Sequence, residues 1–258
     1  MMENLLSFSL PSTLSTPAIL AQPPTSTKQA VILCHGFLSD KNSRTNRRLT
    51  DLLIPHDIAT LRFDWYGMGE SQEDFSDISL KKCGEQLDSA FQTLQERGME
   101  RLGLIGSSFG GLMAILSASR HPTTLQALGL KCPVANFPEV LRLEFGDAAI
   151  DRWKQTNLIP NLLGGETPLS LRYSFFEECL TYDGYASALR IHAPTLIVHG
   201  DQDELIPRNQ IDQLLASLHV SKDLKLIAGA THQFGQPEEF RLMTNHLAQW
   251  MIHHLKAP

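Results

Sequence analysis

The sequence predicts an α/β fold with a mostly parallel central sheet and helices on both faces. From residue 28 onward, short apolar runs alternate with longer amphipathic stretches, a pattern typical of βα units. One long segment, residues 136–190, breaks this alternation. The length of 258 residues allows one large α/β domain or two small ones, with a substantial core.

Each element follows from composition and period. Apolar runs rich in Val, Ile or Leu predict strands at 30–34, 58–63, 101–105, 127–132, 195–198 and 224–228. Amphipathic stretches predict helices at 43–53, 79–97, 110–120, 208–218 and 237–255. The opening segment has two short strand candidates, 5–10 and 18–21, separated by Pro, Ser and Thr. They predict a β-hairpin at the sheet edge.

In the last predicted helix, apolar residues recur at helical spacing and predict a core-facing stripe. The members of the stripe are Phe240, Met243, Leu247, Trp250 and Met251. Three histidines, His246, His253 and His254, lie off the stripe, and we expect them to face solvent. Metal binding by His253 and His254 is the alternative interpretation.

Residues 136–190 are too long for a structureless loop inside a compact domain. We expect a lid insertion with short elements of its own, and a core formed by residues 1–135 and 191–258. The insertion is rich in aromatic residues: Phe137, Phe145, Trp153, Tyr173, Phe175, Phe176, Tyr182 and Tyr185. These side chains either pack the lid onto the core or line a substrate pocket.

Charge and cysteine usage narrow the class of partner and the compartment. The net charge of -6 argues against nucleic acid as the main partner. One basic run, residues 41–48, is interpreted as the solvated face of a helix, with docking of an anionic substrate group as the alternative. Four widely spaced cysteines, Cys34, Cys83, Cys132 and Cys179, predict buried free thiols in a reducing compartment.

The N-terminus lacks the positive flank of a signal peptide, and no apolar run has membrane-spanning length. We therefore expect a cytoplasmic protein without stable membrane insertion.

A serine stands at the apex of a glycine-rich turn between a predicted strand and a predicted helix. The turn is Gly-Ser-Ser-Phe-Gly-Gly at residues 106–111. The pattern G-x-S-x-G in this context predicts a strained turn that exposes a nucleophilic hydroxyl. Spacing selects Ser108, because Ser107 would need glycines at positions 105 and 109.

A serine nucleophile needs a base and an acid that orients the base. His232 follows the last predicted strand, where a parallel sheet presents ligand-contacting residues. The segment after the strand 195–198 offers Asp201, Asp203 and Glu204. Asp203 is favoured because it lies further into the loop, while Asp201 suits the turn itself.

The tetrahedral intermediate of acyl transfer needs backbone donors. We expect the N–H groups of Phe109, directly after the serine, and of Phe37, in the loop after the first core strand, to serve as the oxyanion hole. Gly36 is expected to adopt an unusual backbone conformation that aims the Phe37 N–H inward. In the same loop, His35 is interpreted as a structural hydrogen-bonding residue rather than as a rival base.

Together these residues resemble the α/β-hydrolase family over nearly the whole chain. The segment 64–71, Asp-Trp-Tyr-Gly-Met-Gly-Glu-Ser, is similar to a D-x-x-G-x-G-x-S loop that is a structural turn beside the active site in that family. The short lid and the His-Gly-Phe form resemble serine-hydrolase branches that hold feruloyl or cinnamoyl esterases, monoacylglycerol lipases and serine aminopeptidases.

The resemblance implies a serine hydrolase that cleaves a carboxylic ester of a small molecule through an acyl-enzyme, without a metal or an organic cofactor. Ser108, His232 and Asp203 would form the triad. Thioesters or amides are alternative substrates for the same constellation, because the pocket selects the leaving group. A ligand receptor with little turnover is an alternative from another class, because fold does not fix function.

Overall fold

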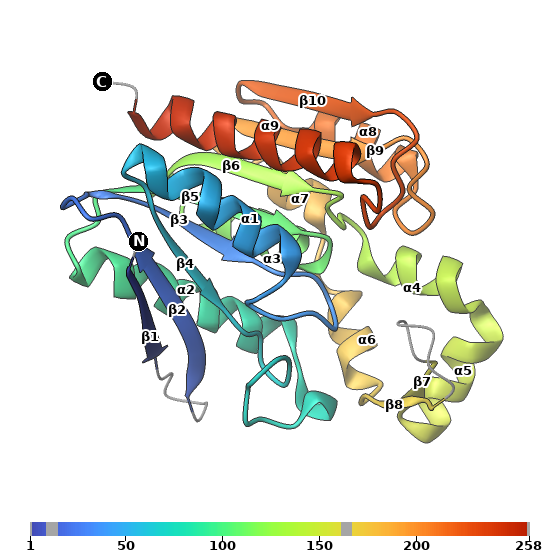
Figure 1. Ribbon diagram of the computed structural model, residues 1–258. Coiled ribbons are helices and arrows are strands. Elements are labelled where there is room, and N and C mark those ends of the chain that lie inside the picture. Colours follow the sequence, from blue (N-terminus) through green and yellow to red (C-terminus); the bar gives the residue numbers. More distant parts are fainter. Residues whose placement is uncertain (1, 9–14, 161–166, 257–258) are drawn as a thin grey trace.

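The computed structural model describes residues 2–8, 15–160 and 167–256. In this part of the chain, an eight-stranded sheet has the order β1-β2-β4-β3-β5-β6-β9-β10 (Figure 1). Its strands are β1 (Met2–Phe8), β2 (Thr16–Gln22), β3 (Gln29–Cys34), β4 (Ala59–Phe63), β5 (Arg101–Ser107), β6 (Leu125–Lys131), β9 (Thr195–Gly200) and β10 (Lys222–Ile227).

From β4 to β10 the neighbouring strands pair in parallel, while β1 and β2 form an antiparallel hairpin at one edge. The α/β fold class with its mostly parallel sheet is therefore confirmed, as is the edge hairpin. Residues 9 and 10 of the predicted strand 5–10 lie outside the described residues.

Helices cover both faces of the sheet (Figure 1). They are α1 (Arg44–Leu53), α2 (Leu80–Glu96), α3 (Phe109–Arg120), α8 (Arg208–Ser217) and α9 (Pro237–Lys256). The pleat of the strands explains the two layers. In β3, Val31 and Leu33 pack with α1 and α9, whereas Ile32 packs with the cluster that includes α2 and α3. Short 3-10 turns occur at Ile54–His56 and Phe75–Asp77.

Between β6 and β9 lie the short elements α4 (Phe137–Phe145), α5 (Asp147–Thr156), β7 (Leu158–Ile159), β8 (Leu169–Ser170), α6 (Ser174–Cys179) and α7 (Gly184–Ala188). The expected insertion thus has secondary structure of its own, while its action as a lid stays a prediction. Several of its aromatic rings pack against the core or against one another, and Phe137 also lines a cavity. Phe137 and Phe175 contact Phe37 of the core, with ring centroids 5.5 and 5.7 Å apart.

The basic run 41–48 is only partly the solvated helix face that we expected. Arg44, Arg47 and Arg48 are exposed, but Lys41 is buried, and its ammonium pairs with Asp64 at 2.5 Å and with Glu70 at 2.7 Å. The prediction is wrong for Lys41 because these two carboxylates compensate its charge in the interior.

The helix α9 presents its predicted stripe to the core, with Met243, Leu247 and Met251 fully buried. Of its histidines, His253 is exposed, whereas His246 and His254 are half-buried rather than solvent-facing. The predicted state of the cysteines is confirmed, since all four are buried free thiols. Within the described ranges, no helix has the length and apolar character needed to span a bilayer.

Candidate active site

Ser108 occupies a sharp turn between β5 and α3. Its φ of 53° and ψ of -114° are a strained combination for a residue with a side chain. The turn is held by backbone bonds, because the Ser108 N–H donates to the Lys131 carbonyl at 2.9 Å and the Ser108 carbonyl accepts from the Gly111 N–H at 2.9 Å. Ser107, in contrast, is the last residue of β5. The structure thus has the tight strand-turn-helix expected around Ser108.

The glycines of this turn are required by close backbone approach. A Cβ on Gly106 would lie 2.2 Å from the Gly110 carbonyl oxygen, and a Cβ on Gly110 would lie 2.5 Å from the carbonyl oxygens of Cys34 and His35. The start of α3 therefore packs directly against the loop that follows β3. This contact brings the predicted oxyanion loop beside Ser108.

The conformation of that loop differs from our expectation. Gly36 does not have a positive φ; the left-handed residue is Leu38, with a φ of 54°. Gly36 instead lies next to the nucleophile candidate, since a Cβ placed on it would be 3.5 Å from the Ser108 Cβ. The small size of Gly36 thus leaves space beside Ser108 rather than providing an unusual turn.

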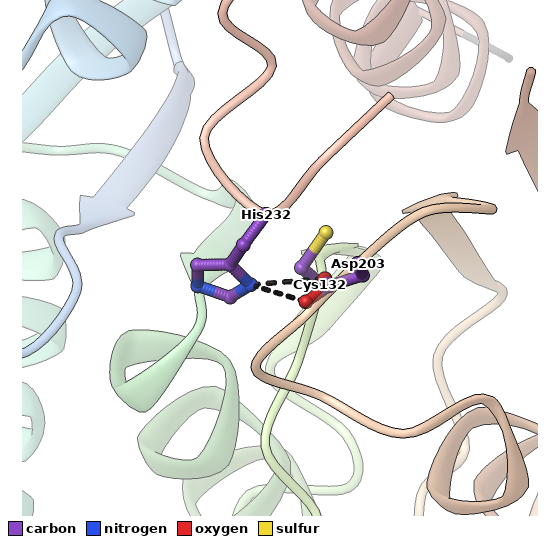
Figure 2. Close-up of side chains that lie close together, drawn as sticks. All are labelled: Cys132, Asp203 and His232. Atoms are coloured by element: carbon purple, nitrogen blue, oxygen red, sulfur yellow. Dashed lines mark hydrogen bonds and ion pairs between the residues drawn. The ribbon is translucent and has the colours of Figure 1, made fainter. Parts of the chain in front are cut away.

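His232 and Asp203 form a buried pair (Figure 2). His232 Nδ1 lies 2.9 and 3.1 Å from the two Asp203 carboxylate oxygens. Only 5% of the His232 side chain and none of the Asp203 side chain is exposed. In Figure 2 the second ring nitrogen, Nε2, lies on the opposite side of the imidazole from Asp203. This geometry fixes the tautomer with the proton on Nδ1, because the carboxylate can only accept.

Asp203 keeps its charge although it is buried. Burial by itself would raise the pKa of this carboxyl, but the hydrogen bond and the proximity of His232, together with the Ile206 N–H, lower the pKa to about 2. The N–H groups of Leu205 and Ile206 donate to one carboxylate oxygen at 3.0 and 2.9 Å. Asp201 has another role, because it accepts from the Gly229 N–H at 2.7 Å and ties two loops together.

Two residues beside Asp203 were not found from the sequence. The Cys132 thiol donates to the Asp203 carboxylate, and burial raises the pKa of this thiol far above its ordinary value. His199, at the end of β9, has its buried Nδ1 3.5 Å from an Asp203 oxygen. Cys132 follows β6, and β6 pairs with β9. The neighbouring strand ends therefore meet. The apolar runs place both residues near strand ends, but the sequence does not show which strands are neighbours.

Ligand atoms of Cys132, Asp203 and His232 lie within 4.8 Å of one another, which makes the group a possible metal site. The donor set fits a metal poorly. The thiol stays protonated, and Asp203 is already engaged by both neighbours, whereas a metal requires a thiolate and free lone pairs.

The backbone of His232 is also fixed. The Lys131 ammonium donates to the His232 carbonyl at 2.7 Å, and the His232 N–H donates to the Glu204 carboxylate at 3.0 Å. Lys131 is buried, and burial lowers the pKa of its ammonium. Sequence reasoning missed Lys131 because a lysine that ends an apolar strand is usually solvated.

His35 has the structural role that we expected. Its Nδ1 lies 2.8 Å from the Gly36 carbonyl, and its Nε2 accepts from the Trp65 N–H at 3.2 Å. Burial lowers the His35 pKa to about 4, so the imidazole is neutral near pH 7.

Asp64 of the 64–71 loop is buried and accepts from the Lys41 N–H and the Glu70 N–H at 2.6 and 2.9 Å. This loop is thus a structural turn, and its Trp65 ring lies 5.9 Å from the ring of Phe109, the residue after Ser108.

A cavity of about 510 Å³ contains both Ser108 and His232 in its wall, together with Phe37. We call one set of its wall residues the apolar lining: Val134, Phe137, Val140, Leu141, Leu205 and Ile206. We call a second set the polar lining: Ser39, Ser43, Arg44, Thr45 and Gln233. The apolar lining comes from the loop after β6, from α4 and from the Asp203 loop, whereas the polar lining comes from the loop before α1, its first turn and the His232 loop.

The family model of the serine aminopeptidase S33 family matches residues 25–167, more than half of the chain. The chain belongs to this family, and it is a serine hydrolase with the α/β-hydrolase fold.

The chain is also similar to more distant relatives and to solved structures with the same fold. The palmitoyl-protein thioesterase ABHD10 of rat mitochondria is 24% identical over 76% of this chain and 66% of its own length, and the human protein is 22% identical over 83% and 70%. The chain therefore spans about two thirds of the length of these relatives. The structure of Est1E from Butyrivibrio proteoclasticus with bound ferulic acid has a TM-score of 0.86 at 23% identity and covers 98% of this chain and 100% of that one. A monoacylglycerol lipase from Paleococcus ferrophilus has a TM-score of 0.68 at 22% identity and covers 91% and 98%.

Proposed function

We propose that the protein hydrolyses carboxylic esters of small molecules through an acyl-enzyme on Ser108. The observation that carries the proposal is the buried Asp203–His232 pair, whose histidine shares a cavity wall with a serine at a strained apex. No organic cofactor or metal takes part in the reaction that we propose. The buried free thiols support a cytoplasmic location.

In the first half of the proposed reaction, His232 Nε2 takes the proton of the Ser108 hydroxyl, and Ser108 Oγ bonds to the ester carbonyl carbon. When the tetrahedral intermediate collapses, the bond from the carbonyl carbon to the alcohol oxygen breaks, and His232 returns the proton to the alcohol. Water then attacks the acyl-enzyme by the same steps and releases the acid. Asp203 orients His232 and stabilises its imidazolium form.

We assign the oxyanion hole to the N–H groups of Phe37 and Phe109. Phe109 is the first residue of α3, where an N–H group has no acceptor within the helix. Phe37 lines the same cavity as Ser108. The turn formed by residues 106–111, which we call the elbow, packs against the Phe37 loop. Each such donor contributes a factor of about a hundred to a thousand to the rate.

Thioesters are a second candidate substrate class. Two observations favour them: relatives carry the name palmitoyl-protein thioesterase, and the apolar lining suits an apolar acyl group. Matched oxygen esters, thioesters and amides with one acyl group would rank the three bonds by kcat/KM.

The test of the proposal is the Ser108→Ala variant. We expect it to lower kcat for a chromogenic ester by about 10⁴-fold or more, because the nucleophile is lost. Ser107→Ala is the matched control, and it should retain most of the activity. A fluorophosphonate should label the natural protein and S107A but not S108A. Full esterase activity in S108A would refute the mechanism, and labelling without multiple turnovers would favour a receptor.

A further inference from the structure

An arginine lies on the wall of the cavity that holds Ser108 and His232. Arg44, the first residue of α1, belongs to the polar lining. Among the described residues it forms no ion pair within 4.0 Å. Its charge is therefore available to a ligand, and the positive end of the α1 dipole lies at the same place.

The guanidinium of Arg44 is held in position by two contacts. Its Nη2 donates to the Phe234 carbonyl at 2.6 Å, and its central carbon lies 3.9 Å from the centre of the Phe240 ring. These contacts use one amino group and one face of the guanidinium, which leaves further N–H donors. An arginine fixed in this way loses little side-chain freedom when it binds an anion.

The same contacts place Arg44 on the side where the alcohol leaves. His232 must give its proton to the leaving oxygen, so the leaving group lies next to His232. Arg44 is bonded to Phe234, two residues after His232, and Gln233 of the same loop belongs to the polar lining. The acyl group would then contact the apolar lining, which comes from α4, the loop after β6 and the Asp203 loop.

We propose that Arg44 binds an oxyanionic group, such as a carboxylate, on the alcohol portion of an ester whose acyl portion is apolar. This inference rests on the proposed function, because it concerns the substrate class of the same site. It makes the anion-docking interpretation of the basic run specific to Arg44, since Lys41 is used internally by Asp64 and Glu70.

One acidic residue also belongs to the cavity wall. Glu144 of α4 is exposed and lies in the same helix as three members of the apolar lining. A cationic alcohol beside Glu144 would be the opposite preference. We favour the anion because Arg44 is held by two contacts on the His232 side, whereas Glu144 belongs to the helix that supplies the acyl wall.

The experiment uses three esters with the same apolar acyl group, whose alcohols are neutral, carboxylate-bearing or ammonium-bearing. For each protein, kcat/KM of a charged ester is divided by that of the neutral ester, and these ratios are compared between variants, so that intrinsic reactivity cancels. We expect Arg44→Gln to lower the ratio for the carboxylate ester about tenfold, because the variant loses one charge-assisted hydrogen bond to the carboxylate. Arg47→Gln, an exposed arginine of α1 outside the cavity wall, is the matched control and should not change the ratio.

Arg44→Lys keeps the charge without the planar fork, and we expect it to retain part of the carboxylate preference. High salt should reduce the preference of the natural protein. Thermal unfolding of the Arg44 variants checks that they are folded. An unchanged carboxylate ratio in folded R44Q, or a preference for the ammonium ester that Glu144→Gln abolishes, would overturn the inference. If Ser108-dependent hydrolysis is absent for all three esters, the proposed function itself fails.

Discussion

Asp203 is a buried carboxylate whose charge is stabilised by donors from three segments. His232 Nδ1, the N–H groups of Leu205 and Ile206, and the Cys132 thiol all face it. Together these donors stabilise the ionised carboxylate more than water does. The orienting acid that we propose is therefore charged at neutral pH and well below it.

A dependence of stability on pH follows for Asp203. The folded pKa of about 2 lies below the ordinary value of 3.8, so the charge contributes stability that is present above about pH 4 and lost as pH falls toward 2. The contribution amounts to about 2 kcal/mol. Asp203→Asn cannot titrate, so the free energies of unfolding of the natural protein and D203N should approach each other by about this amount between pH 4 and 2.

Denaturant unfolding of both proteins at a series of pH values measures this difference. All other carboxyl groups are present in both proteins, so their titration cancels. A difference in unfolding free energy that stays constant from pH 5 to 2 would show that Asp203 does not carry a lowered pKa.

At the scale of elements, the elbow depends on contact between α3 and the loop after β3. A Cβ on Gly110 would meet two backbone carbonyl oxygens, those of Cys34 and His35, at 2.5 Å. Backbone atoms cannot move aside as a flexible side chain can. The position of α3, and with it the Phe109 N–H, is therefore set by the absence of a side chain at residue 110.

We predict that Gly110→Ala lowers the free energy of unfolding by about 3 kcal/mol, because it overpacks a backbone contact. It should also lower kcat, because the Phe37 and Phe109 donors separate. Gly98→Ala is the matched control. Gly98 has a φ of 80° but open space around it, so alanine there should cost about 1 kcal/mol of strain only. Equal losses for the two variants in denaturant unfolding would contradict the packing argument.

The elements themselves were largely predictable from the sequence. Every bound of the six core strands and five helices lies within two residues of its predicted position, because apolar periodicity reports burial directly. The elbow and the loops of Asp203 and His232 follow from the same runs, since they stand at the carboxyl ends of strands.

The remaining features depend on contacts between distant segments. The sequence predicts a solvated Lys41, because its partners Asp64 and Glu70 are 23 and 29 residues away along the chain and are brought to it only by the fold. Cys132 reaches Asp203 only because β6 pairs with β9, and strand order is not written in local periodicity. The predicted conformation of Gly36 was wrong because a glycine can be needed where two segments approach closely as well as in a left-handed turn.

At the scale of the whole molecule, the insertion is tied to the core at both of its ends. At its start, the Gln210 side chain of α8 accepts from the Ala135 and Asn136 N–H groups at 3.2 and 3.1 Å. Near its end, Glu178 of α6 accepts from the Leu80 and Lys81 N–H groups at 2.8 and 2.9 Å. Glu178 thus satisfies two free donors at the start of α2.

The Glu178 contact makes the docking of the insertion testable. We predict that Glu178→Ala lowers the free energy of unfolding by about 1 kcal/mol, the cost of a lost helix cap, and speeds hydrogen exchange in α6 and the first turn of α2 while β3, β5 and β6 stay protected. Glu177→Ala, which removes an exposed carboxylate from the same helix, is the control and should change neither quantity. If exchange in α6 is as slow in E178A as in E177A, the aromatic contacts of Phe137 and Phe175 with Phe37 suffice to hold the insertion. Its movement as a lid would then have to break those ring contacts, which border the cavity of Ser108.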